Sequence, residues 1–262
     1  MLAIITSILV VSGIGLVCGV ALALGARYLS VEENPLIGTV TELLLGANCG
    51  ACGYAGCGGY AQAIVAGEAP PNRCPSCTPE ALAQISAALG IAPIEAAARE
   101  VALVLCRGDD EQAQKRFVYD GITDCAAAAA VGGGDKACRY GCLGYGTCLR
   151  ACPAGAIEMV NGVARVHPEL CISCRKCVAA CPRGIIRMVP AASHTHIFCS
   201  SRDPGATVRK VCKVGCIGCR ICTRLAEGAI TMDGTLAVVD YKQPLDNEEL
   251  PAKCPGKCIL KV

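Results

Sequence analysis

The stretch Cys138–Pro182 contains CRYGCLGYGTCLRACP at 138–153 and CISCRKCVAACP at 171–182. Each half is a cysteine quartet that ends in Cys-Pro. This is the spacing that holds paired [4Fe–4S] clusters, in which the fourth cysteine of each quartet binds the other cluster. A four-cysteine zinc site is the alternative, but it has no use for a third close cysteine or for a following proline. The pattern therefore favours iron–sulfur clusters over zinc.

The first quartet departs from the simplest pattern, because Tyr145 stands where its middle cysteine is expected. Cys138, four residues ahead of Cys142, can supply the missing thiolate. With the fourth ligands exchanged, the sequence predicts one cluster on Cys138, Cys142, Cys148 and Cys181. It predicts a second on Cys152, Cys171, Cys174 and Cys177. Between the quartets, Asn161-Gly162 predicts a hairpin over 157–166.

The composition agrees with small modules that fold around inorganic clusters. The 262 residues include 23 Cys and 30 Gly but only two Phe and no Trp, so metal–ligand bonds would have to replace missing apolar burial. Disulfides are the competing use of so many cysteines, but cysteines spaced in threes are poor disulfide partners. Clusters also indicate a reducing compartment. The net charge of +2 says little, and we expect no nucleic-acid partner.

The N-terminal residues 1–29 are apolar, and no charge precedes Arg27. The run is long enough to cross a bilayer of about 30 Å once. A signal peptide is the alternative, but no positively charged region precedes the apolar run. We expect a retained anchor, with Arg27 at its cytoplasmic end and Cys18 inside it as a small hydrophobic residue.

A second cysteine group lies in residues 30–90, where three short helices are predicted. One starts at Asn34-Pro35 and runs to Leu45, one covers 58–66, and one runs from Thr78-Pro79 to Gly90. Between them, glycine-rich sequence surrounds a cysteine triplet and suits a loop wrapped around a cluster. The predicted ligands are Cys49, Cys52, Cys57 and either Cys74 or Cys77.

The segment 91–134 is expected to link this domain to the cysteine quartets. Residues 91–105 are apolar and fit a helix or a strand. The pattern of 109–116 predicts a charged surface helix. Residues 126–136 end in GGGDK, which lacks the phosphate-loop spacing and favours a flexible hinge.

A second ferredoxin-like module is predicted over 191–262, with a hairpin at Asp233-Gly234. Its cluster ligands would be Cys216, Cys219, Cys222 and Cys254. The ligands of the other cluster are all missing, with Leu225 and Ala226 at one position and Pro244, Asn247 and Leu250 at the others. When the fourth ligand of each half is assigned to the other cluster, the missing positions are all ligands of one cluster, and the four ligands of the other cluster remain. We therefore expect one cluster here.

Seven cysteines then have no role: Cys18, Cys77, Cys106, Cys125, Cys199, Cys212 and Cys258. Four of them flank the paired quartets, two on each side. One hypothesis is a fifth cluster on Cys106, Cys125, Cys199 and Cys212. The alternative is that they are buried free thiols. Four clusters are therefore expected, and five under this hypothesis.

An apolar N-terminal helix, then C49-x2-C52-x4-C57-x16-C74, then the Cys138–Cys181 module, resembles the B subunit of the Rnf complex. That complex is an ion-translocating ferredoxin:NAD oxidoreductase of bacterial membranes. The resemblance covers nearly the whole chain, and the added module looks like the long form found in anaerobes. It implies Cys74 as the fourth ligand. The departures at Ala226, Pro244, Asn247 and Leu250 put one family cluster in doubt.

The resemblance implies a subunit that accepts electrons from soluble reduced ferredoxin and relays them to other Rnf subunits in the membrane. The implied location is the bacterial inner (plasma) membrane, with a single pass and the soluble part on the cytoplasmic side. A membrane reductase that resets an iron–sulfur transcription sensor is the alternative. We expect no catalytic residue and no complete active site in this chain, because no histidine accompanies a nucleophile.

The expected fold is therefore α+β. A membrane helix (1–29) precedes a small helical [4Fe–4S] domain (30–90), a linking segment (91–134) and two ferredoxin-like modules with short hairpins (135–190 and 191–262). The stretch from Arg165 to Arg224 contains eleven Lys and Arg residues but only two acidic residues, Glu169 and Asp203. This charge either offsets the clusters or attracts an acidic partner. The candidates for docking are Arg175, Lys176, Arg209, Lys210, Lys213 and Arg220.

Overall fold

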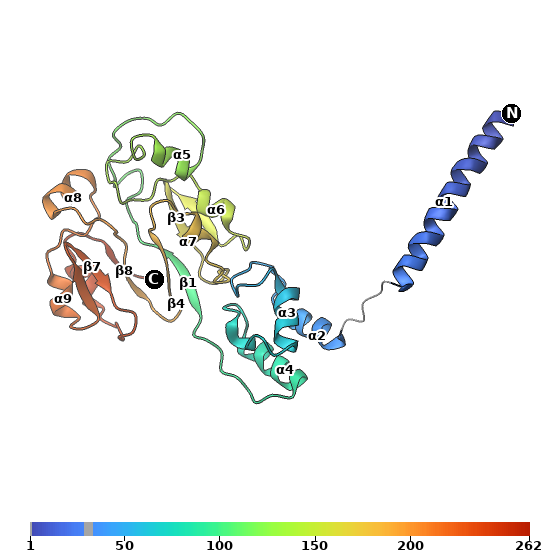
Figure 1. Cartoon of the computed structure of the whole chain (residues 1–262). Coiled ribbons are helices and arrows are strands. Elements are labelled where there is room, and N and C mark those ends of the chain that lie inside the picture. Colours follow the sequence, from blue (N-terminus) through green and yellow to red (C-terminus); the bar gives the residue numbers. More distant parts are fainter. Residues whose placement is uncertain (1, 29–33) are drawn as a thin grey trace.

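The computed structural model describes residues 2–28 and 34–262. Helix α1 (Leu2–Tyr28) stands apart from the rest of the chain in Figure 1. Its span Ile4–Tyr28 has a mean hydropathy of 2.5 and is exposed along its length. A helix of this length extends about 38 Å, which exceeds the roughly 30 Å hydrocarbon core of a bilayer. By length and composition α1 can cross a membrane, although a signal sequence has the same features.

The N-terminal domain (34–90) is a small helical unit. Its elements are α2 (Pro35–Leu43), α3 (Cys57–Val65), the 3-10 helix η1 (Pro71–Arg73) and α4 (Pro79–Leu89). Asn34 caps α2 by accepting the Leu36 N–H at 3.0 Å, and Thr78 caps α4 by accepting the Ala81 N–H at 3.2 Å. These caps confirm the predicted helix starts, while α2 ends at Leu43 rather than at Leu45.

Two later segments repeat one arrangement of strands and helices, visible side by side in Figure 1. The first repeat (100–190) consists of β1 (Glu100–Val104), α5 (Cys125–Ala130), α6 (Thr147–Ala151), β2 (Ile157–Val160), β3 (Val163–Val166), α7 (Lys176–Ala180) and β4 (Ile186–Pro190). The second repeat (195–261) consists of β5 (Thr195–Ile197), α8 (Gly205–Val211), α9 (Ile221–Leu225), β6 (Ile230–Asp233), β7 (Leu236–Val239), α10 (Glu249–Lys253) and β8 (Ile259–Lys261).

Each repeat contains two antiparallel two-stranded sheets. The outer strands pair as β1 with β4 and as β5 with β8, and the inner strands form hairpins β2–β3 and β6–β7. Asn161 and Gly162 take φ values of 46° and 73°, so the first hairpin turns where predicted. In the second, Asp233 pairs with Leu236, so the turn lies at Gly234-Thr235, one residue later than expected.

The hydrophobic cores of both repeats and of the N-terminal domain all contain cysteines. In the first repeat, Cys142, Cys148 and Cys177 are buried together with Ile157 and Ile186. The thiols are therefore part of the packing that holds the sheets and helices together.

The segment that joins the N-terminal domain to the first repeat differs from its predictions. Residues 109–116 are not helical, which corrects the predicted surface helix. The Asp109 carboxylate accepts the Glu111 and Gln112 N–H groups, and the Gln114 N–H bonds to Val211 O, so the backbone turns and bonds outward. The stretch 91–105, which fitted a helix or a strand, contains β1. The stretch 126–136 was expected to be a flexible hinge, but its first five residues belong to helix α5.

Candidate iron–sulfur sites

All 23 cysteines are free thiols. Among residues 2–28 and 34–262, no three His, Cys, Asp or Glu side chains converge closely enough to hold a single metal ion. Most of the thiols instead line small cavities in groups of four. A thiolate is the usual ligand of a [4Fe–4S] cluster, so the donor chemistry of these groups fits that cofactor.

Site 1 is the thiol group of the N-terminal domain: Cys49, Cys52, Cys57 and Cys74. Burial raises the pKa of Cys74, and the charges of the other three thiolates raise it further. Burial also raises the pKa of Cys77 to about 11, but Cys74 is the one thiol that adds to this shift. The charges of the triplet thus act on Cys74 and not on Cys77, which favours Cys74 as the fourth thiol of this group.

A tyrosine fixes the chain that leads to Cys74. Tyr60 on α3 is 1% exposed, and its hydroxyl donates to Pro70 O at 2.7 Å and accepts the Arg73 N–H at 3.0 Å. Burial raises the pKa of Tyr60 to about 12. No sequence signal marks this residue, since nothing in the sequence shows which carbonyl a tyrosine reaches.

Site 2 differs from the set expected from sequence. One cavity is lined by the thiols of Cys125, Cys142, Cys148 and Cys181, and Cys138 is not among them. Burial raises the pKa of Cys148 to about 12, followed by the charges of Cys142, Cys125 and Cys181. Asp124 caps α5 and accepts the Thr147 hydroxyl at 2.8 Å, while the Cys125 N–H donates to Thr147 at 2.7 Å. These bonds hold Cys125 at the cavity.

Site 3 brings together the expected set, because one cavity is lined by Cys152, Cys171, Cys174 and Cys177. Burial raises the pKa of Cys177 to about 11, and the other three thiolates add to the shift. Backbone N–H groups donate to two of the sulfurs, from Ala156 to Cys152 at 3.4 Å and from Ala102 on β1 to Cys171 at 3.5 Å. Hydrogen bonds to the sulfurs are one way a protein tunes a cluster.

Site 4 lies in the second repeat, where one cavity is lined by Cys216, Cys219, Cys222 and Cys254. Cys258 also lines this cavity, is 2% exposed and has its sulfur 3.8 Å from that of Cys254. Interaction with the Cys258 thiol lowers the pKa of Cys254 to about 5 and the pKa of Cys216 to about 6. Cys219 is exposed, so this site reaches the surface.

In the second repeat, protein side chains fill the place where a second cluster would bind in a two-cluster module. Leu250 is 1% exposed and Ala226 is 9% exposed, and both belong to the hydrophobic core of the repeat. The Asn247 side chain donates to Leu225 O at 3.0 Å. The residues that replace cysteine at these positions thus contribute to apolar packing or form a hydrogen bond, as expected if they bind no cluster.

A further cavity, the junction site, lies where the two repeats meet. It is lined by the thiols of Cys106, Cys138, Cys199 and Cys212 together with Lys136. The expected fifth set had Cys125 in place of Cys138, whereas Cys125 lines the site 2 cavity and Cys138 lines the junction cavity.

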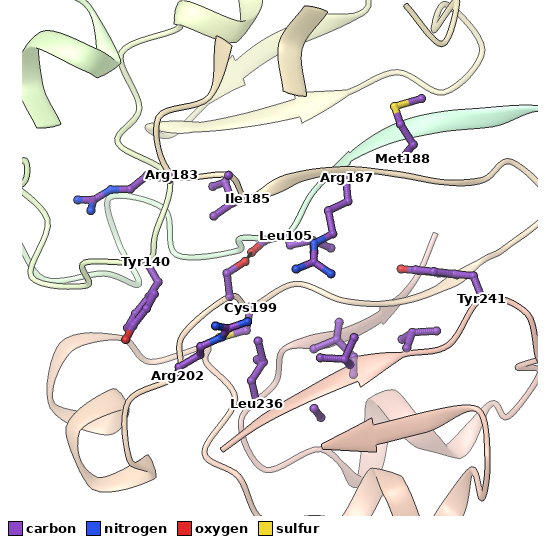
Figure 2. A pocket seen from close by; sticks show the side chains of 16 residues that line it. Leu105, Tyr140, Arg183, Ile185, Arg187, Met188, Cys199, Arg202, Leu236 and Tyr241 are labelled. Atoms are coloured by element: carbon purple, nitrogen blue, oxygen red, sulfur yellow. Dashed lines mark hydrogen bonds between the residues drawn. The ribbon is translucent and has the colours of Figure 1, made fainter. Parts of the chain in front are cut away.

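Cys199 also borders a larger cleft of about 410 Å³ between the repeats. Figure 2 shows three arginines around this cleft, Arg183, Arg187 and Arg202, which come from both repeats. Arg202 pairs with Asp233 at 2.6 Å. Asp233 offsets the charge of Arg202, and Arg183 and Arg187 leave the lining of the cleft positively charged beside the junction site.

Comparison with models of protein families identifies two iron–sulfur domains in the chain. Residues 44–76 match a family described as "Putative Fe-S cluster", and residues 137–185 match the family described as "4Fe-4S dicluster domain". These matches cover sites 1 and 3 and most of site 2.

Curated relatives match along almost the whole chain. The B subunit of the ion-translocating oxidoreductase complex of Methanosarcina acetivorans is 42% identical over 257 residues, which are 97% of each chain. The chain belongs to this family of B subunits. The B subunit of the proton-translocating ferredoxin:NAD(+) oxidoreductase complex of Clostridium ljungdahlii is 40% identical over 266 residues, 99% of this chain and 93% of the relative. The Na(+)-translocating counterpart from Acetobacterium woodii is 39% identical over 247 residues, 94% and 74%.

Membership of this family confirms the resemblance to the Rnf complex. Its members are electron-transfer components of a translocating oxidoreductase. In this chain, cysteines line the cavities that lie within the matched iron–sulfur domains.

Proposed function

We propose that this chain relays electrons through [4Fe–4S] clusters from soluble reduced ferredoxin to membrane subunits of an ion-translocating ferredoxin:NAD oxidoreductase. Four clusters would bind sites 1 to 4. The observation that carries the proposal is that sites 1, 2 and 3 neighbour one another, which suits a relay because electron tunnelling weakens steeply with distance.

Sites 1 and 3 meet across the contact between the N-terminal domain and the first repeat. Burial raises the pKa of Cys174 in site 3, and the thiolate of Cys49 in site 1 adds to that shift. The Ser76 hydroxyl donates to Ile172 O across the same contact. Sites 2 and 3 share the packed core of the first repeat. This proximity supports transfer in steps through sites 2, 3 and 1.

Site 4 is the proposed entry point for electrons. Its Cys219 is exposed, unlike the other cysteines of the four proposed sites, and Arg220 follows at the cavity rim. Arg209, Lys210 and Lys213 lie on or just after α8 of the same repeat and are exposed. Such charges would attract an acidic ferredoxin and speed the encounter.

Site 1 is the proposed exit towards the membrane. Five residues separate Tyr28, the end of α1, from Asn34, which caps the first helix of the N-terminal domain. A chain of that length spans at most about 20 Å. We therefore place site 1 next to the membrane surface, with α1 as a single-pass anchor and the soluble part on the cytoplasmic side.

The bound clusters would supply one-electron chemistry, and the residues of this chain would hold and tune them. Burial excludes water from the thiols, and backbone N–H groups at sites 3 and 4 donate to the ligand sulfurs, for example from Ala237 to Cys216 at 3.5 Å. Hydrogen bonds and exposure of this kind set cluster potentials.

The test is the rate at which reduced ferredoxin reduces the full chain, measured by stopped flow at several salt concentrations. Arg220→Gln is expected to slow the reaction several-fold at low salt and to leave it unchanged at high salt, because salt screens the attraction. Lys242→Gln, an exposed lysine of the same repeat, is the matched control. A rate that ignores both salt and Arg220 would refute docking of ferredoxin at site 4.

A further inference from the structure

The junction site is built from equivalent positions of the two repeats. Cys106 lies two residues after β1, and Cys199 lies two residues after β5. Cys138 precedes Cys142 in CRYGC, and Cys212 precedes Cys216 in CKVGC. Each repeat therefore contributes two thiols from equivalent positions. One lies two residues after the first strand of the repeat, and the other lies four residues before the next cysteine in the chain.

The hydrogen bonds around these thiols follow the same repeat. The Cys142 N–H donates to the Cys106 sulfur at 3.3 Å, and the Cys216 N–H likewise lowers the pKa of Cys199, which burial raises to about 11. The Ser201 N–H donates to the Cys199 sulfur at 3.5 Å. Such donors stabilise a thiolate sulfur, which is the form that binds a cluster.

A glycine shapes the wall of the cavity. A Cβ on Gly108 would lie 3.3 Å from the Cys212 sulfur and 3.8 Å from the Cys106 sulfur. Gly108 has no positive φ, so the side-chain space rather than the backbone conformation favours glycine here. The two thiols, which come from different repeats, thus approach the same point.

A buried positive charge favours a cluster over free thiols. Lys136 is 1% exposed, and its ammonium donates to Gly108 O at 2.9 Å and to Gly162 O at 2.8 Å. Among the residues that the structure describes, it forms no ion pair with a carboxylate. A buried charge without an opposite charge is costly. Four neutral thiols would leave the ammonium uncompensated, whereas a cluster bound by four thiolates would supply negative charge.

The cavity also closes a gap in the relay. Cys106 is bonded to the backbone of Cys142 in site 2, and Cys199 is bonded to that of Cys216 in site 4. The junction site is therefore a thiol group that touches both site 4 of the second repeat and site 2 of the first.

We propose that Cys106, Cys138, Cys199 and Cys212 bind a fifth [4Fe–4S] cluster that carries electrons from site 4 to site 2, with Cys125 as the fourth ligand of site 2. Each transfer moves one electron from the reduced site 4 cluster, which is oxidised, to the junction cluster, which is reduced and then reoxidised by site 2. The proposal rests on the relay proposed above. Five such clusters use every cysteine except Cys18, Cys77 and Cys258.

The experiment counts iron and acid-labile sulfide in the anaerobically purified full chain and in pairs of Cys→Ala variants. Five clusters give about twenty irons per chain, and four give about sixteen. Cys199→Ala is expected to lose four irons. Cys138→Ala combined with Cys199→Ala is expected to lose the same four, because both residues serve one cluster, whereas Cys125→Ala combined with Cys199→Ala loses eight.

Cys18→Ala is the matched control, an exposed thiol on α1 outside the five sites that should keep all the iron. If the 125/199 pair loses four irons and the 138/199 pair eight, the ligand exchange is overturned. Sixteen irons in the unaltered chain, with no loss in Cys199→Ala, overturn the fifth cluster and leave the four-cluster relay standing. About four irons or fewer in the unaltered chain overturn both. The unaltered chain gives its answer even if a variant fails to fold.

Discussion

Lys136 offers a direct test of the charge balance at the junction. Lys136→Met removes the ammonium but keeps a long side chain of similar volume. The Lys136 ammonium lies 2.9 Å from Gly108 O, and the Cys212 sulfur lies 3.3 Å from the Cβ position of the same glycine. Across one residue these contacts put the charge within about 9 Å of the Cys212 sulfur, and so of the proposed junction cluster. At an effective dielectric of about 20, a unit charge at that distance stabilises an added electron by about 2 kcal/mol.

That energy corresponds to about 90 mV for a one-electron couple. Because a positive charge favours the reduced cluster, Lys136→Met should lower the midpoint potential of the junction cluster by about that amount. The cluster of site 2 should shift in the same direction, since the ammonium also favours the thiolate of Cys142 by lowering its pKa against the larger effect of burial.

The assay is a redox titration followed by electron paramagnetic resonance. Lys115→Met is the matched control, because Lys115 pairs with Lys136 across an isolated β-bridge but is half exposed and bonded to Asp110 at 3.0 Å. Solvent screens its charge, so its removal should move the potentials little. Equal shifts in both variants, or a rise in Lys136→Met, would refute the reasoning.

Three further results are expected. Tyr60→Phe should lower the free energy of unfolding by about 1–3 kcal/mol in anaerobic denaturant titrations, because it frees Pro70 O and the Arg73 N–H; a stability equal to that of Tyr54→Phe would contradict this. Stripping iron and sulfide should abolish amide protection in both repeats, since cysteines belong to their cores; preserved protection would count against it. Burial lowers the pKa of His196, so the folded chain binds that proton less readily than the unfolded chain and loses stability as the pH falls through about 6.5. His196→Gln should weaken this pH dependence of the melting temperature, and an identical dependence would refute the assignment.

Local signals predicted much of the fold. Asn34 and Thr78 sit at helix starts with proline behind them, and their side chains do cap the helices. Asn161-Gly162 takes the positive φ values that its turn requires. These features depend on neighbours in the chain, so the sequence alone suffices to predict them.

The features that were missed depend on contacts between distant segments. Residues 109–116 carry a helical pattern, but their backbone bonds to Val211 and Asp135 instead. The sequence assigned Cys138 to site 2 because it is nearer to Cys142 in the chain, whereas folding brings Cys125 to the site 2 cavity through α5 and Thr147, which is the basis of the exchange that we propose. A signal for the exchange was present: Cys138 and Cys212 both stand four residues before a cysteine.

Nothing in the sequence marked Lys136 for burial. It follows Asp135 in a glycine-rich stretch that is typical of a surface loop, but it is held by two carbonyls from distant turns. Its position becomes clear only when the strands of the first repeat are assembled around it.

In the proposed relay, electrons cross from the second repeat to the N-terminal domain through neighbouring clusters. The test is freeze-quench electron paramagnetic resonance of the chain mixed with reduced ferredoxin, in which Cys199→Ala is compared with Cys18→Ala, a variant on α1 outside the cluster sites. We expect the cluster of site 4 to be reduced at an unchanged rate in both, while the clusters of sites 1, 2 and 3 lag by at least tenfold in Cys199→Ala alone. Simultaneous reduction of all the remaining clusters in Cys199→Ala would contradict the account.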